Sequence, residues 1–267
     1  MDREEMKSKI MKGFTIALPI LLVAILAMLI VVAMDLAKKE NSLPAFNDGS
    51  QSTSTTSNSS EETPPDPPLE DPSSLGLSFI SNGDGTCALL GIGECSDSFI
   101  IVPMTSPEGD IVTEIADGAF KNFLAIRGVE LPSTLQTIGA YAFYGSSIKE
   151  IVIPETVEDI GNYAFSGCRS LGKIEVEVGN SQYCSISGAL YNADGSTLIT
   201  YPAGKTDNFV NISRDVTTIE NMAFYRCNSI KKVNYHGTSQ SWRSVEIGAG
   251  NDIIDEAFIY CAGDSGK

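Results

Sequence analysis

The feature that most constrains this chain is a short pattern that recurs five times in one register. Each copy consists of an isoleucine, three variable residues and the pair Ala-Phe. The isoleucines are Ile115, Ile138, Ile160, Ile219 and Ile253, and the phenylalanines are Phe120, Phe143, Phe165, Phe224 and Phe258. A self-similar period of about 22 residues indicates that one small structural unit is stacked repeatedly into a solenoid.

Between the copies lie short runs of β-branched residues that often end in proline, as in 129–132, 151–154 and 199–202. We expect each unit to contain a strand, a turn and a short helical turn that carries Ala-Phe. Gly139, Gly145 and Gly161 permit tight turns. Alone, such a unit cannot bury its apolar residues, but stacked units share one core. The 59-residue interval between the third and fourth phenylalanines therefore holds altered coils rather than a separate domain.

Several less common segments also carry a family resemblance. They are 83–95, 183–202 and 235–251, each rich in Gly, Tyr or Trp at fixed offsets. With the repeat, they resemble the BspA-like (Treponema pallidum-type) leucine-rich repeats of bacterial surface proteins, over residues 78–261. The resemblance implies a non-enzymatic extracellular interaction domain, with adhesion to host proteins in some members. The predicted fold class is α/β: a leucine-rich-repeat solenoid with a parallel β-sheet face.

The solenoid is expected over residues 111–267 with a terminal cap, and an N-terminal β-hairpin cap is expected over 76–110. Residues 82–85 and 192–195 read as Asn-Gly and Asp-Gly hairpin turns rather than calcium loops, because no bidentate Glu follows. Trp242, the sole tryptophan, is expected to close the last coil rather than to be an exposed binding anchor.

Residues 13–34 form an uncharged apolar stretch long enough to span a bilayer as a helix. Four basic residues precede it within 1–12, and only Lys38 and Lys39 follow closely, so the positive-inside rule places the N-terminus in the cytoplasm. The sequence predicts a single-pass protein of the cell membrane whose C-terminal domain is extracellular. A cleaved signal peptide is the alternative, although the apolar region of a signal peptide is usually shorter than this stretch.

Residues 35–75 are rich in Ser, Thr and Pro and poor in apolar side chains. Such a segment cannot bury enough surface to offset its ordering entropy. We expect it to form a disordered stalk between the transmembrane helix and the folded domain.

The six cysteines fall into two groups. Cys168, Cys227 and Cys261 each lie three residues after a repeated phenylalanine, so we expect small, buried packing residues in a stacked row. Cys87 and Cys95 flank a Gly-rich segment that we interpret as a hairpin, and an exported domain permits a disulfide there. Free thiols remain the alternative, because cross-strand disulfide geometry is demanding.

No catalytic constellation is found. His236 is the sole histidine, and no nucleophile elbow or paired Cys-x-x-Cys motif accompanies it. We therefore expect no enzymatic activity, no metal site and no cofactor. A formal net charge of −16 excludes a broad basic surface for nucleic acid.

Strand alternation predicts a binding surface. If Val129 and Ile151 point inward, then Glu130, Val152 and Glu175 line the outer face of the sheet. Solenoids commonly bind partners through such a ribbon. We expect a cell-surface module that binds an extracellular protein or glycan, with attachment to a host as one form of this role.

The alternative is an envelope scaffold that binds the cell's own wall or membrane partners. A flexible stalk of this length reaches only about 35 Å, which would leave the domain inside a thick wall.

Overall fold

The computed structural model describes residues 73–264. The predicted cytoplasmic segment 1–12, transmembrane helix 13–34 and nearly all of the stalk 35–75 lie outside the described residues. Within 73–264, none of the helices has the length and apolar character that crossing a membrane requires.

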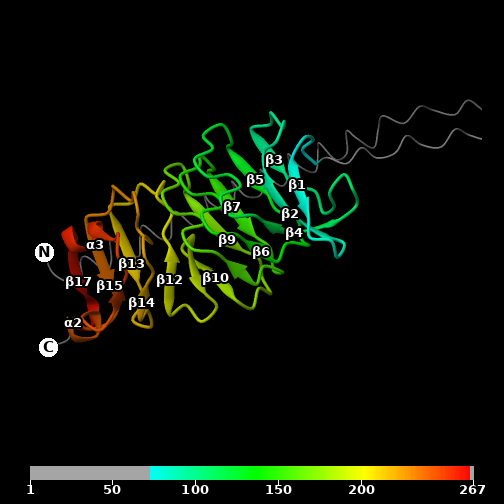
Figure 1. Cartoon of the computed structure of the whole chain (residues 1–267). Helices are drawn as coiled ribbons and strands as arrows, with labels where there is room; N and C mark the ends of the chain where they lie inside the picture. The colour runs from blue at the N-terminus through cyan, green and yellow to red at the C-terminus, as the bar shows by residue number, and fades with distance from the viewer. Residues whose placement is uncertain (1–72, 265–267) are drawn as a thin grey trace, which may run out of the picture. The chain divides into compact units, whose positions relative to one another are not determined.

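The described chain winds as a β-solenoid, with strands that follow one another in chain order (Figure 1). The strands of its first half are β1 (Ser78–Ser81), β2 (Thr86–Gly91), β3 (Phe99–Ile101), β4 (Ile111–Ile115), β5 (Gly128–Glu130), β6 (Thr137–Ile138), β7 (Glu150–Ile153), β8 (Asp159–Ile160) and β9 (Lys173–Val176). Those of its second half are β10 (Tyr183–Ile186), β11 (Ala189–Asn192), β12 (Thr197–Thr200), β13 (Phe209–Ile212), β14 (Thr218–Ile219), β15 (Lys232–Tyr235), β16 (Glu246–Ile247) and β17 (Phe258–Cys261).

Each coil contributes one strand to each of two rows. The motif row contains the four strands that end in a repeated isoleucine, β4, β6, β8 and β14, together with β2, β12 and β16. Strands β2, β4, β6 and β8 form one parallel series, and β12, β14 and β16 form the next. The groove row contains β3, β5, β7 and β9, followed by β13, β15 and β17, and its hydrogen-bonded pairs are parallel. The predicted parallel sheet is therefore present as two rows rather than one.

The repeated apolar residues form the core between the rows. Ile115, Ile138, Phe143 and Phe165 expose at most 2% of their surface. The rings of Phe120 and Phe143 stack with centroids 5.1 Å apart, and those of Phe143 and Phe165 stack at 5.4 Å. The one-coil spacing of the Ala-Phe pair thus produces a continuous aromatic ladder.

The prediction of a short helical turn around each Ala-Phe pair is wrong. The residue before each of the first four Ala-Phe pairs adopts a positive φ: 67° at Gly118, 57° at Tyr141, 62° at Tyr163 and 57° at Met222. A right-handed helix requires a negative φ at every residue, so these segments are turns and not helices. The only α-helices between residues 73 and 264 are α2 (Ser239–Trp242) and α3 (Asp252–Glu256). The α/β assignment is accordingly replaced by a mainly β solenoid.

Two of the repeat glycines have a role other than the predicted tight turn. Gly145 does adopt a positive φ of 66°, but Gly139 and Gly161 do not. A Cβ atom on Gly139 would lie 2.6 Å from the backbone nitrogen of Asp117, and one on Gly161 would lie 2.7 Å from Cα of Ala140. Gly139 and Gly161 therefore allow successive coils to approach each other closely.

The long interval after Phe165 contains an inserted antiparallel unit. Strands β10, β11 and β12 pair in sequence, and β12 then rejoins the parallel motif row beside β14. The turn at 192–195 connects β11 to β12, as predicted. The buried core divides at β11, where Leu190 packs with the first cluster and Ala189 with the second. The interval thus holds altered coils, as expected.

The assignment of residues 253–258 as a fifth copy of the repeat is wrong. Its Phe258 lies in β17 and is 67% exposed, whereas the other four phenylalanines are buried. Ile247, not Ile253, pairs with Ile219 in the motif row. Helix α3 lies between this strand and β17, so the Ile-x-x-x-Ala-Phe match at 253–258 is coincidental in structural terms. Cys261 consequently lies half-buried in β17, outside the row of buried cysteines.

Both ends of the solenoid are capped. At the N-terminal end, β1 and β2 form an antiparallel hairpin whose turn is 82–85. Just before it, Ser74 donates its backbone N–H to the carbonyl of Ile101 at 2.9 Å, so the folded unit includes the last residues assigned to the stalk. At the C-terminal end, Trp242 packs against Tyr235 with ring centroids 5.1 Å apart, which agrees with its predicted capping role.

Candidate groove on the outer sheet face

The residues predicted to face outward do so. Val129, Ile151 and Ile174 are buried, whereas Glu130 and Glu175 are exposed and Val152 is 44% exposed. Val152 pairs in register with Glu175, and the neighbouring strand β5 presents Glu130. The three predicted residues therefore share the outer face of the groove row.

This face is hollowed by two adjoining depressions, with volumes of about 470 and 410 Å³. They share Glu130, Leu131, Pro154 and Glu177, and we treat them as one groove. The first depression extends toward Ser73, Ile101, Val102, Pro103, Met104, Thr105, Pro132 and Ser133. The second extends toward Phe99, Val129, Glu150, Ile151, Val152 and Glu175.

Exposed apolar side chains line part of the groove. Phe99 is 53% exposed and Met104 is 58% exposed. The ring of Phe99 lies over Gly128, where a Cβ atom would come within 2.6 Å of the ring. The absence of a side chain at Gly128 therefore leaves room for the aromatic ring, and Val152 extends the apolar surface across β7.

Carboxylates surround these apolar residues. Glu130, Glu150, Glu175 and Glu177 line the groove, and none of its lining residues is Lys or Arg. Lys173 forms an ion pair with Glu175. Glu177 accepts a hydrogen bond from the backbone N–H of Glu155 at 3.0 Å, which orients its carboxylate. The groove is thus complementary to apolar and cationic groups.

The predicted disulfide partners are both free thiols in the structure. They do not flank the hairpin turn, because Cys87 lies within β2 and the turn precedes it. The Cys87 side chain is buried, and its thiol donates to the carbonyl oxygen of Asp110 at 3.6 Å. Cys95 lies in the loop beyond β2 and is half-buried. Neither residue contacts the groove.

Nothing else in the described chain suggests reaction chemistry. Residues 73–264 contain no cluster of three or more side chains that could hold a metal ion. His236 is exposed. Cys168 and Cys227 are buried, as predicted, and burial raises the pKa of Cys227 to about 12, so neither resembles an activated nucleophile.

The fold defines the protein as a leucine-rich-repeat solenoid, and a family model makes the assignment specific. The model described as "BspA type Leucine rich repeat region" matches residues 104–207 and 204–261 in six copies. The chain belongs to this family.

Several solved bacterial structures are similar to this chain. The pneumococcal vaccine antigen PcpA is 24% identical over 57% of this chain and 36% of its own, with a TM-score of 0.50. A leucine-rich cell surface protein from Faecalibacterium prausnitzii is 20% identical, covering 70% and 73%, with a TM-score of 0.42. A leucine-rich repeat protein from Eubacterium ventriosum is 30% identical, covering 51% and 41%, also at 0.42. The chain thus spans about a third of the PcpA chain, and no curated protein matches it.

Sequence reasoning missed the aromatic end of the groove. Phe99 begins the run 99–103, which has the same strand-then-proline form as 150–154 and 128–132. This run therefore signals a further groove-row strand, and its first outward residue is Phe99. Glu177 carried no such signal, because it reaches the groove from the turn after β9.

Proposed function

We propose that the protein is a non-enzymatic cell-surface recognition module whose groove binds an extended segment of an extracellular protein partner. The observation that carries this proposal is the continuous groove over β3, β5, β7 and β9, in which exposed Phe99 and Val152 lie among carboxylates. Apolar side chains supply the affinity of most interfaces, and complementary charge selects the partner. A segment with alternating apolar and basic side chains suits this surface.

Two locations are compatible with this role. Exposure at the cell surface, through a transmembrane helix at 13–34, would allow attachment to a host. A scaffold within the envelope would bind the cell's own components, and the short stalk favours it because the reach is only about 35 Å. Protease treatment of intact cells separates the two, since a surface domain is cleaved and an envelope domain is protected.

The proposal is tested by displaying the full-length chain on streptavidin and probing matrix proteins, mucins, wall glycans and whole cells. Multivalent display matters because avidity makes weak single-site contacts measurable. We expect a saturable hit among the proteins that Glu130→Lys weakens by about tenfold or more. Glu246→Lys is the matched control, because Glu246 is an exposed glutamate on a motif-row strand away from the groove. Absence of any hit with folded protein, or equal loss in both variants, contradicts the proposal.

A further inference from the structure

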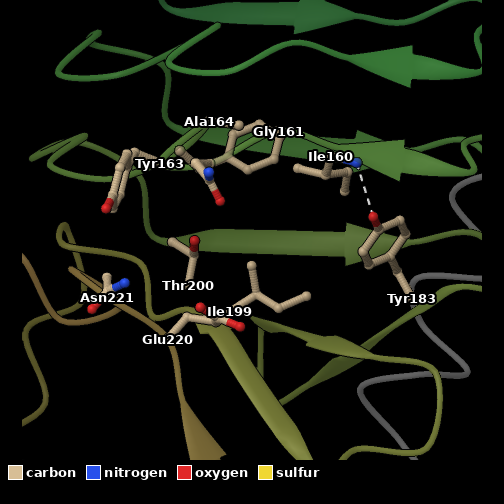
Figure 2. A pocket seen from close by; sticks show the side chains of 11 residues that line it. Ile160, Gly161, Tyr163, Ala164, Tyr183, Ile199, Thr200, Glu220 and Asn221 are labelled. Atoms are coloured by element: carbon tan, nitrogen blue, oxygen red, sulfur yellow. Dashed lines mark hydrogen bonds between the residues drawn. The ribbon is translucent and has the colours of Figure 1, made fainter. Parts of the chain in front are cut away.

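A second cavity lies at the break in the motif row, away from the groove. Strand β8 is the last strand of one sheet and β10 the first of the next. The pocket there has a volume of about 170 Å³ and lies between the coil 160–165 and residues 199–200 and 220–221. Figure 2 shows Ile160 and Tyr183 at one end, joined by a hydrogen bond, and Tyr163 and Asn221 at the other.

In the regular coils, the groups equivalent to those lining this pocket bind the following coil. Tyr141 and Phe143 donate their backbone N–H groups to the carbonyls of Asn162 and Ala164, at 2.9 and 2.8 Å. Gly118 and Phe120 make the same two bonds one coil earlier. The backbone of each coil therefore presents two donors, two residues apart, toward its successor.

A side-chain oxygen accompanies these donors in other coils. Asp117 accepts a hydrogen bond from the N–H of Ala140 at 2.6 Å, and Asn221 accepts one from Ala249 at 2.7 Å. Asn162 occupies the same position in its own coil. Three of the coils thus carry a side-chain acceptor beside their two backbone donors, whereas the coil before Asn162 has Ala140 at this position.

At the pocket this set has no resident partner. Among residues 73–264, no hydrogen bond satisfies the N–H groups of Tyr163 and Phe165 or the amide of Asn162. Thr200 lines the opposite wall of the pocket, and Figure 2 shows its side chain directed toward Tyr163 and Ala164. The two backbone donors and the exposed amide of Asn162 face the open pocket, so this cluster is suited to a ligand that both donates and accepts hydrogen bonds.

Tyr163 adopts a positive φ, as Tyr141 and Met222 do at the same position of their coils. Its φ of 62° is a conformation that glycine adopts freely, and the equivalent residue one repeat unit before Tyr141 is Gly118. Tyr163 places an aromatic ring at the mouth of the pocket.

We propose that this pocket binds an N-acetylhexosamine unit of a glycan. The acetamido carbonyl would accept from the N–H groups of Tyr163 and Phe165, and the acetamido N–H would donate to Asn162. Thr200, Glu220 and Asn221 offer partners to the ring hydroxyls, and the Tyr163 ring offers an apolar face to the sugar. A pocket of this size admits an acetamido group with part of its ring, but not a peptide that carries large side chains.

The test compares two oligosaccharides of equal length, an N-acetylglucosamine trimer and a glucose trimer, which lacks the amide. The full-length chain is studied in a detergent without a sugar headgroup, by calorimetry and by saturation-transfer NMR. We expect binding of the N-acetylated trimer alone, with the acetyl methyl protons most strongly saturated. Equal binding of both trimers, or binding of neither to folded protein, would overturn the proposal.

Two variants separate the site from the fold. Asn162→Ala removes the acceptor, and we expect it to weaken binding by about tenfold, whereas Asn228→Ala, an exposed control outside the pocket, leaves binding unchanged. Tyr163→Gly removes the ring but relieves the positive φ, so we expect weaker binding at an equal or higher melting temperature. An unchanged affinity for the N-acetylglucosamine trimer in both pocket variants would contradict the proposal.

The same chemistry occurs in bacterial wall glycan and in host mucin. Purified wall glycan strands and mucin, each competed with the N-acetylglucosamine trimer, identify the source. If the trimer displaces either wall glycan or mucin, the result supports the site. If it displaces neither, the result contradicts the proposal. This outcome is independent of the groove, because none of the pocket residues lines the groove.

Discussion

At the scale of single residues, the aromatic ladder determines stability. Phe143 stacks on Phe120 and Phe165 and has no exposed surface. We expect Phe143→Ala to lower the free energy of unfolding by about 3–5 kcal/mol, from lost burial and the remaining cavity. Phe258→Ala is the matched control: its ring is 67% exposed, so the change should stay within about 0.5 kcal/mol. Denaturant titration measures both, and equal losses would contradict the reassignment of the fifth repeat copy.

The buried cysteines provide a chemical test at the same scale. Burial raises the pKa of Cys227 to about 12 and also raises that of Cys168. Because only the thiolate is alkylated, we expect neither to react with iodoacetamide at about pH 8 until the chain is unfolded. Peptide mass spectrometry of native and denatured samples measures this. Rapid labelling of Cys227 in the native protein would show that the second core cluster is open.

Residue orientation was predictable from the sequence because a strand alternates its side chains with a fixed period. The outward positions of Glu130, Val152 and Glu175 follow from that rule alone. The error at Phe258 has the opposite origin: a six-residue pattern does not report which strand it pairs with, and only the pairing of Ile219 with Ile247 reveals the true last coil.

At the scale of elements, close coil packing depends on glycine. A Cβ atom on Gly161 would contact the backbone nitrogen of Ala140 and lie 2.7 Å from its Cα. Backbone cannot move aside as a flexible side chain can, so we expect Gly161→Ala to destabilise the protein by about 1–3 kcal/mol. Thermal unfolding measures the change.

The control for this prediction is Gly172→Ala. The nearest atom to a Cβ at Gly172 is the carbonyl oxygen of Lys149 at 3.9 Å, an ordinary contact. We expect a change of no more than about 0.5 kcal/mol there. Equal effects at Gly161 and Gly172 would show that the loss reflects backbone entropy instead of coil contact.

The helical turn was predicted wrongly because composition does not reveal φ. Tyr141, Tyr163 and Met222 are residues that normally avoid the left-handed region, yet the stacked coils hold them there. Tertiary packing overrides the local preference at these turns. Gly118, at the same position in the first copy, was the one local signal that the backbone turns there.

At the scale of the whole folded unit, the inserted strands β10–β12 divide the core into two clusters. In stacked repeats, stability is approximately a sum of local and nearest-neighbour contributions. We expect Phe143→Ala to raise amide exchange about tenfold or more within 86–176 and much less within 209–261.

The reciprocal variant provides the control for this exchange experiment. Phe224 stacks with Tyr201 in the second cluster, at 5.1 Å between centroids. Phe224→Ala should therefore loosen 209–261 preferentially. Uniform acceleration by either variant would indicate a single cooperative core.

The sequence predicted the solenoid and the outer face, since both follow from a repeating pattern. It did not predict the pocket at the sheet break. That pocket depends on where the inserted strands leave the regular path and on which backbone groups lose a neighbouring coil. The residue types at positions 162 and 163 do not reveal either of these features.

The proposed function requires that the groove face bind the partner. The most direct measurement uses a partner found by the display experiment. Its affinity is measured for two variants of this protein, Val152→Glu and Ile247→Glu. Val152 is 44% exposed in the groove, and Ile247 is 36% exposed on the motif row. We predict a loss of about tenfold or more for Val152→Glu and an unchanged affinity for Ile247→Glu. Wild-type affinity in both variants would contradict the claim.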